Sequence, residues 1–249
     1  QYGLNIAGQN IANVNTEGYV RRRVNLSEVP PPDGKSGGTV TVGGVKAIRD
    51  ALLEARLRNS FTAEEHHGAL ASALQVVETT LGTAGNSIDG RLASFFNAFG
   101  TLASDPTSAT LRSSVLVQGR ELAAAFNDMA DRFNGAQQSA DMQIRSGVEQ
   151  INTLAGQVAR LNALIGSANG ADTESLKDQQ AVALKSLAGL ADISVLPRAD
   201  GQSDVSIGNG RALVVGSSQY ALAATSVGPS GYTQITLGNA TITNEITSG

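Results

Sequence analysis

The stretch that decides the fold runs from Leu111 to Ile165 and reads LRSSVLVQGRELAAAFNDMADRFNGAQQSADMQIRSGVEQINTLAGQVARLNALI. Its apolar residues recur at steps of three, four and seven, which is the spacing of one face of an α-helix. We predict two helices, the first beginning near Ser108, with coiled-coil-like seams. The two stripes are Leu111, Val115, Leu122, Phe126, Met129, Phe133, Ala136 and Ala140, and then Ile144, Val148, Ile151, Ala155, Val158, Asn162 and Ile165.

These stripes have two interpretations. The favoured one is an intrachain helical bundle, because an apolar stripe on a helix is usually buried in the core. The stripe around Phe126 would then pack on the stripe that starts at Ile144, and replacing Phe126 by Ala would cost ~3–5 kcal/mol. In the other interpretation, part of this surface packs against other copies of the chain.

Further helices are predicted on both sides of this stretch. Asp50 is a good N-cap for a helix whose apolar side chains fall at spacings of three and four. A shorter helix around Leu92–Leu102 ends at Ser104–Pro106, because proline stops helix propagation. The last helix begins at Asp172–Ser175 and continues to about Leu190.

Strand signals replace helix signals after Asp192, where apolar residues alternate with a period of two. Asn209-Gly210 and Gly238-Asn239 are signals for hairpin turns. Near the N-terminus, two glycines separate Thr39–Val42 from Val45–Ile48, which predicts a hairpin or a bent strand pair. The predicted fold class is α+β: an elongated helical bundle with coiled-coil-like seams, followed by a small antiparallel β domain.

Four segments follow from these patterns. Residues 1–20 show a short helical pattern. Gly18 is predicted to form the turn that ends this helix. Residues 21–49 are an extended connector with short strands. Residues 50–190 form the helical body, and residues 191–249 form the antiparallel β domain, which we expect to be incomplete.

Composition restricts the function before any motif does. The 249 residues include no cysteine, which excludes disulfides, cysteine–zinc sites and thiol nucleophiles. The net charge is -4, whereas a nucleic-acid partner requires a basic face. No apolar run reaches the ~18 residues of a membrane span. Aromatic residues make up only 4% and leave little to line a small-molecule pocket. We therefore expect a structural protein, not an enzyme, with no cofactor and no bound metal.

The few candidate chemical motifs favour structural interpretations. Gly34–Ser36 matches the end of a phosphate loop, but Val29 stands where the first glycine belongs. The adjacent histidines of Glu64–His67 project about 100° apart on a helix, so we predict a solvated helix face rather than a metal site. Arg21–Arg23 is predicted to be a solvated strand edge, with a salt bridge to an acidic neighbouring subunit as the alternative.

Residues 10–19 read NIANVNTEGY, which closely resembles the N-terminal signature of bacterial flagellar rod, hook and hook-associated proteins. Further along, Ile48–Asp50, Phe95–Phe99, Leu102–Pro106 and Gly210–Gly216 resemble the hook-associated protein 1 family of the hook–filament junction. The resemblance extends over essentially the whole chain.

This resemblance implies a non-enzymatic subunit of the flagellar axis at the junction between hook and filament. The implied partners are other copies in a ring, the hook protein, a second junction protein that precedes flagellin, and an export chaperone. The implied location is the extracellular flagellum, reached without a cleaved signal peptide. Residues 1–20 would be the axial segment of the inner tube. The assembly motif comprises Asn10, Ile11, Ala12, Asn13, Asn15, Thr16, Gly18 and Tyr19.

Two positions depart from the family pattern, and two other functions stay open. Glu17 stands where the family often has proline, and Gln180-Ala181 stand where an Arg-Asp pair is typical. One alternative is another flagellar axial protein, of the rod or hook type. The other is an enzyme or ligand-binding domain, with its chemistry in the β module or at Glu64 and His67.

Overall fold

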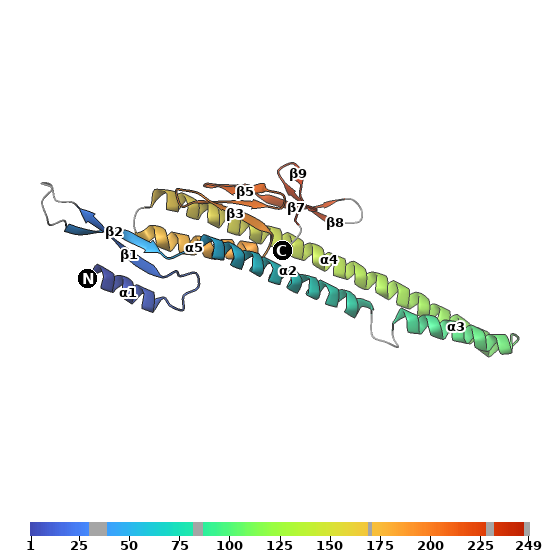
Figure 1. Ribbon diagram of the computed structural model, residues 1–249. Coiled ribbons are helices and arrows are strands. Elements are labelled where there is room, and N and C mark those ends of the chain that lie inside the picture. Colours follow the sequence, from blue (N-terminus) through green and yellow to red (C-terminus); the bar gives the residue numbers. More distant parts are fainter. Residues whose placement is uncertain (30–38, 82–86, 169–170, 228–231, 247–249) are drawn as a thin grey trace. The chain divides into compact units, whose positions relative to one another are not determined.

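The computed structural model describes residues 1–29, 39–81, 87–168, 171–227 and 232–246. The chain divides into two compact units. The first unit comprises residues 1–66 and 145–249, and the second comprises residues 67–144. Gly34–Ser36, which the sequence analysis compared with a phosphate loop, lie outside the described residues. Figure 1 traces the order of the elements along the chain.

The first unit begins with a helix and a two-stranded ribbon. Helix α1 (Tyr2–Ala12) precedes strands β1 (Arg22–Val29) and β2 (Thr39–Ala47), which pair antiparallel. The sequence analysis was wrong in dividing residues 39–48 into two strands. The two glycines instead form a bulge in one continuous strand, where Asn25 pairs with Gly44 and the next residue pairs with Val42.

Helix α2 (Ala51–Leu81) begins where its cap was predicted. The Asp50 carboxylate accepts hydrogen bonds from the backbone N–H groups of Leu52 and Leu53, each at 3.0 Å. It thereby satisfies two of the donors that a helix start leaves unpaired. Helix α2 also contacts α5 (Ala171–Ala188). The buried hydroxyl of Thr62, near the middle of α2, donates to the backbone oxygen of Ala188 at 2.7 Å.

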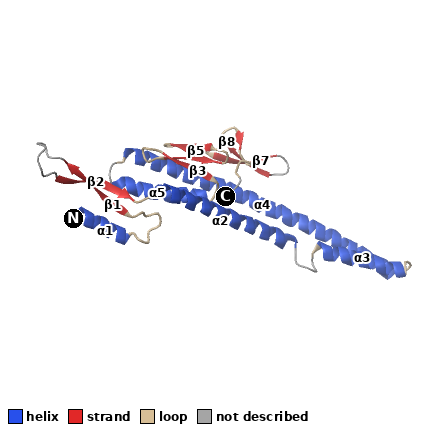
Figure 2. Ribbon diagram, viewed as in Figure 1, coloured by secondary structure: helices blue, strands red, loops and turns tan. Residues whose placement is uncertain are grey.

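Two small antiparallel sheets complete the first unit (Figure 2). The order in the first is β3 (Ile193–Pro197), β4 (Ser203–Ile207), β5 (Arg211–Val215) and β6 (Ser218–Gln219). The second contains β7 (Leu222–Val227), β8 (Tyr232–Leu237) and β9 (Ala240–Thr241). The predicted turns are confirmed between β4 and β5 and between β8 and β9.

The hydrophobic core of the first unit joins the end of α4 (Ala109–Ser167) to α5 and the sheets. From α4 it takes Val148, Ile151, Ala155, Val158 and Leu161, from α5 Leu184 and Leu187, and from the strands Val205, Ile207, Leu213 and Val214. The second half of the predicted apolar stripe is therefore core, as expected. This second half is covered by α5 and the β strands, and not by the first half of the stripe.

The second unit consists of the end of α2, α3 (Ile88–Ser104) and the start of α4. Helix α3 ends before Asp105-Pro106, as predicted. The rings of Phe95 and Phe99 meet edge to face with centroids 4.9 Å apart, and Arg91 pairs with Glu121 at 2.7 Å. Val115 is buried, but most apolar side chains of this unit are partly exposed.

The prediction of two helices between Leu111 and Ile165 was wrong, because α4 is one continuous helix (Figure 1). Two stripes on one straight element cannot fold back on each other. Between Phe133 and Ile144 the chain has no proline, and its alanine and amide residues continue the helical spacing. As a consequence Phe126 is 51% exposed and Phe133 is 38% exposed.

We expect Phe126→Ala to cost about 1 kcal/mol, since burying a whole phenylalanine side chain contributes about 1.5–3 kcal/mol and only half of this one is covered. Leu187→Ala, at a fully buried position of the other unit, should cost about 2–5 kcal/mol. Urea unfolding of both variants, followed by circular dichroism, measures the two free energies. A loss at Phe126 as large as that at Leu187 would show that this ring is buried in solution.

Candidate functional site

Asn10 holds the predicted assembly motif together. Its side-chain amide donates to the backbone oxygen of Arg22 at 2.9 Å, and its side-chain oxygen accepts from the backbone N–H of Arg22 at 2.9 Å. The same oxygen accepts from the Tyr19 hydroxyl at 3.0 Å. The Asn10 side chain thus bonds to both the backbone N–H and the backbone oxygen of Arg22, the first residue of β1, as a neighbouring strand would. These bonds fix α1 against the β1–β2 ribbon.

The turn between α1 and β1 is fastened by further side chains of the motif. The Asn13 amide donates to the backbone oxygen of Gln9 at 3.0 Å, and the Thr16 hydroxyl donates to the Asn13 side-chain oxygen at 3.2 Å. Gly18 has φ +77°, as its predicted place in a turn requires. The structure therefore brings Asn10, Asn13, Thr16, Gly18 and Tyr19 into one arrangement, whereas Ile11, Ala12 and Asn15 are exposed.

Gly18 also lies close against α5. A Cβ atom at this position would lie 2.3 Å from the Cγ2 atom of Val182 and 3.3 Å from the backbone oxygen of Asp178. The first distance is far below van der Waals contact. The absence of a side chain at residue 18 is thus what allows the turn to lie on α5.

A cluster of ion pairs lies next to this contact, and sequence reasoning missed it. Asp178 binds Arg22 at 2.9 Å through one oxygen and Arg49 through the other. Glu174, one turn earlier on α5, accepts a hydrogen bond from the backbone N–H of Ala47 at 3.2 Å. Its other carboxylate oxygen lies 3.0 Å from the ammonium group of Lys177. Three segments distant in sequence therefore meet at two carboxylates.

The prediction of a solvated edge was wrong for Arg22. Only 11% of its side chain is exposed, its partner Asp178 lies in the same chain, and its guanidinium carbon lies 4.9 Å from the centroid of the Tyr19 ring. Arg21 and Arg23 are exposed, as predicted. The available signal was the i, i+4 spacing of Glu174 and Asp178, which places two carboxylates on one face of α5.

Helix α1 and the residues just after it present an uncovered apolar surface beside the fastened turn. Leu4, Ile11 and Val14 are 79%, 76% and 74% exposed, while Ile6 is buried. Large aliphatic side chains that are exposed and close together in sequence are typical of protein interaction sites. This surface can contribute to packing between proteins.

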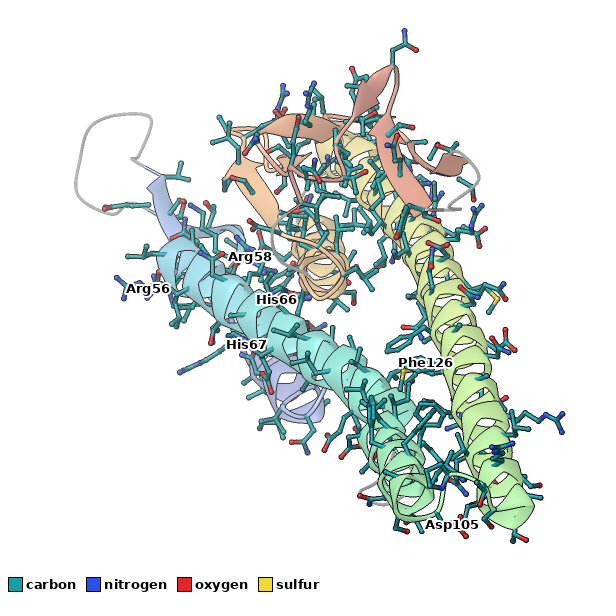
Figure 3. All side chains as sticks on the ribbon, turned by 90° about the vertical axis from the view of Figure 1, so that its right-hand side faces the viewer. Arg56, Arg58, His66, His67, Asp105 and Phe126 are labelled. Carbon is teal, nitrogen blue, oxygen red and sulfur yellow. The ribbon has the colours of Figure 1, made fainter. Side chains whose placement is uncertain are left out.

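A groove of about 500 Å³ lies between the turn, α2 and α5. Leu57 and Phe61 contribute apolar surface, and Arg58 and Lys185 contribute charge. Burial lowers the pKa of the Arg58 guanidinium, an effect that nearby Glu54 opposes. Arg56 and Arg58 are labelled on α2 in Figure 3.

The two histidines do not form a metal site with their neighbours. Figure 3 labels both on α2, where Glu64, Glu65 and His67 are exposed and His66 is half-buried. Over the residues that the structure describes, no three His, Asp or Glu side chains are placed to hold a metal ion. Nor does any helix in the described ranges have both the length and the apolar character of a membrane span.

Comparison with known proteins identifies the family. The family model described as the flagellar hook-associated protein FlgK helical domain matches residues 74–249, which is most of the chain. The chain belongs to the flagellar hook-associated protein FlgK family. The matched region contains α5 with both carboxylates of the ion-pair cluster, as well as the core and the sheets.

Individual FlgK-family proteins agree with this assignment. Flagellar hook-associated protein 1 of Escherichia coli K12 is 27% identical over 231 residues, which cover 90% of this chain and 42% of that protein. The Bacillus subtilis 168 protein of the same name is 27% identical over 208 residues, or 78% of this chain and 41% of that protein. The chain thus spans less than half the length of these relatives.

A solved structure shows the same fold. The flagellar hook junction protein FlgK from Burkholderia pseudomallei superimposes with a TM-score of 0.65 and 24% identity, over 77% of this chain and 37% of that one. The match agrees with the predicted fold class, helices followed by small antiparallel sheets.

The two departures from the FlgK-family pattern both have partners in this chain. Glu17 pairs with Lys185 at 2.9 Å, and the hydrogen bond from Lys185 lowers the pKa of the Glu17 carboxyl. Gln180 is buried, and its amide donates to the Asn162 side-chain oxygen at 2.6 Å. Glutamine at this position thus joins a polar network beneath β4.

Proposed function

We propose that this chain is part of a structural subunit at the junction between the flagellar hook and filament, and that it assembles by packing against other subunits. Membership of the FlgK family carries this proposal. The exposed apolar surface at Leu4 and Ile11 of α1, and at Val14 just after it, supports it, since such a surface is suited to contact with another protein.

The partners that fit this function are other copies in a ring, the hook protein, and a second junction protein that precedes flagellin. An export chaperone holds the subunit before assembly. The subunit lies in the extracellular flagellum, which it reaches without a cleaved signal peptide, and it acts without enzymatic chemistry or a cofactor. Residues 10–19 are the assembly motif, in which Asn10 and Gly18 set the position of α1.

Electron microscopy of cells that lack the gene tests the function. Complete hooks without filaments are the expected result, because filament growth requires the junction. Loss of the hook itself would instead indicate a rod or hook protein. A normal filament would overturn both assignments.

Complementation of that strain tests the role of the α1 surface. Ile11→Asp should fail to restore filaments, because a carboxylate cannot be buried in an apolar interface without a partner. Its unfolding curve should match the wild type, since Ile11 is 76% exposed within the chain. Asn5→Asp places the same charge at another exposed position of α1 and should restore filaments. If Ile11→Asp also restores them, this surface is not an assembly contact.

A further inference from the structure

The hydrophobic core of the first unit does not reach residues 1–50. Among the described residues, its cluster starts at Val148 and takes no side chain from α1, β1 or β2. Ile6 and Val45 are buried, but both lie outside that cluster. Helix α2 is held separately, through the hydrogen bond from Thr62 to Ala188. Some contact other than the apolar core must therefore hold residues 1–50 on α5.

The contacts that do so converge on the two carboxylates of α5. Asp178 bridges Arg22 at the start of β1 and Arg49 just after β2. Glu174 accepts from the backbone of Ala47 at 3.2 Å and lies 3.9 Å from the Nε of Arg49. Charge-assisted hydrogen bonds of this kind are about twice as strong as neutral ones. Both carboxylate side chains are only 11% exposed, so solvent screens these pairs less than surface pairs.

Among the described residues, Asp178 is the only carboxylate that pairs with Arg22, whereas Arg49 also lies 3.6 Å from Glu54 and 3.9 Å from Glu174. The Nε groups of Arg22 and Arg49 are already buried without a hydrogen-bond partner. Removing the Asp178 charge would leave the Arg22 guanidinium, whose side chain is only 11% exposed, without its carboxylate partner and close to the guanidinium of Arg49. Truncating one member of a buried ion pair is strongly unfavourable for this reason.

We propose that Asp178 is a positioning residue, which latches residues 1–50 to α5. Without its charge, residues 1–50 detach from α5 as one piece, while the core formed by α4, α5 and the sheets stays folded. The proposal rests on the proposed function only in one respect, namely that residues 1–50 contain the assembly motif. The latch would then set the orientation in which the motif is presented.

Amide hydrogen exchange of the purified protein tests the latch without any flagellum. The N–H group of Ala47 reports on the latch, because it donates to Glu174 on α5. The N–H group of Arg22 donates to Asn10 within residues 1–50, so it reports on whether the detached piece stays intact. The N–H groups of Val158 and Leu187 report on the core. In Asp178→Asn the Ala47 group should exchange about tenfold faster or more, and the Arg22, Val158 and Leu187 groups within about twofold of wild type.

Three further variants make the test decisive. Glu17→Gln removes an exposed ion pair between the same turn and α5 and should leave exchange unchanged, since exposed pairs contribute little. Asp178→Glu keeps the charge and should fall between wild type and Asp178→Asn. Arg49→Met removes the opposite charge and should also accelerate exchange at Ala47. Unchanged exchange at Ala47, or equal acceleration in the core, would overturn the proposal, as would loss of the fold in both Asp178→Asn and Arg49→Met.

Discussion

Gly18→Ala is expected to weaken the docking of residues 1–50 on α5 by about 2–5 kcal/mol. Two costs add at this position. The left-handed backbone costs a residue with a Cβ atom about 1–2 kcal/mol, and forcing an extra atom into a packed contact costs typically about 1–3 kcal/mol. The extra atom would lie 2.3 Å from the branched side chain of Val182, which has little freedom to move away.

Amide exchange at Ala47, whose N–H donates to Glu174 on α5, measures this loss, which corresponds to roughly 30- to 4,000-fold faster exchange at 1.4 kcal/mol per factor of ten. The double variant Gly18→Ala, Val182→Ala relieves the steric part and should recover part of the loss. Gly8→Ala is the matched control, because Gly8 lies in α1 with open space around it. It should stabilise α1 by up to about 1 kcal/mol. Equal effects at both glycines would mean that contact with α5 is unimportant.

Asn162→Ala is expected to cost about 3–6 kcal/mol of global stability, the largest effect of any substitution considered. The side chain is fully buried and uses all four of its hydrogen-bonding positions. Its amide donates to the backbone oxygens of Ser203 and Gly216 at 2.8 and 2.6 Å. Its oxygen accepts from the Ser203 backbone N–H at 3.0 Å and from the Gln180 amide at 2.6 Å. Each partner left unpaired in the core costs about 1–3 kcal/mol.

Urea unfolding measures this cost, and Asn152→Ala provides the matched comparison. Asn152 lies on the same helix and makes two hydrogen bonds to the backbone of Leu222, each at 2.8 Å, but it is only half-buried. Water can replace these bonds, so we expect a loss of about 1–2 kcal/mol. A loss at residue 162 no larger than at residue 152 would show that the network beneath β4 is not essential.

Helix periods and stop signals were sufficient to predict most element boundaries. The Asp50 cap, the stop at Ser104–Pro106 and the turn at Asn209-Gly210 depend on local chemistry, and all three are confirmed. The division of α4 into two helices failed because periodicity identifies a buried face but not the partner that covers it. The two halves of the α4 stripe have the same spacing, yet Phe126 is exposed and Val158 is buried.

Only those parts of the candidate site that have short-range signals in the sequence were predicted. The motif Asn10–Tyr19 was identified by resemblance, and Gly18 by its turn chemistry. The ion pair between Asp178 and Arg49 was not predicted, because two residues 129 positions apart produce no periodic pattern in the sequence. Asn162 was placed in an apolar stripe, where the spacing is correct but the side chain serves a polar network. A single sequence does not show which distant residues tertiary folding brings together.

The separation between residues 1–50 and the core has a consequence for the order in which the chain becomes ordered. The buried side chains of the core all come from one part of the chain, between Val148 and Ile242. The latch joins residues 156 positions apart, from Arg22 to Asp178. A chain made from its N-terminus produces the assembly motif first and its anchor on α5 more than 150 residues later. Until then the motif has no docking surface, so a growing or unfinished chain cannot hold it in the assembly geometry.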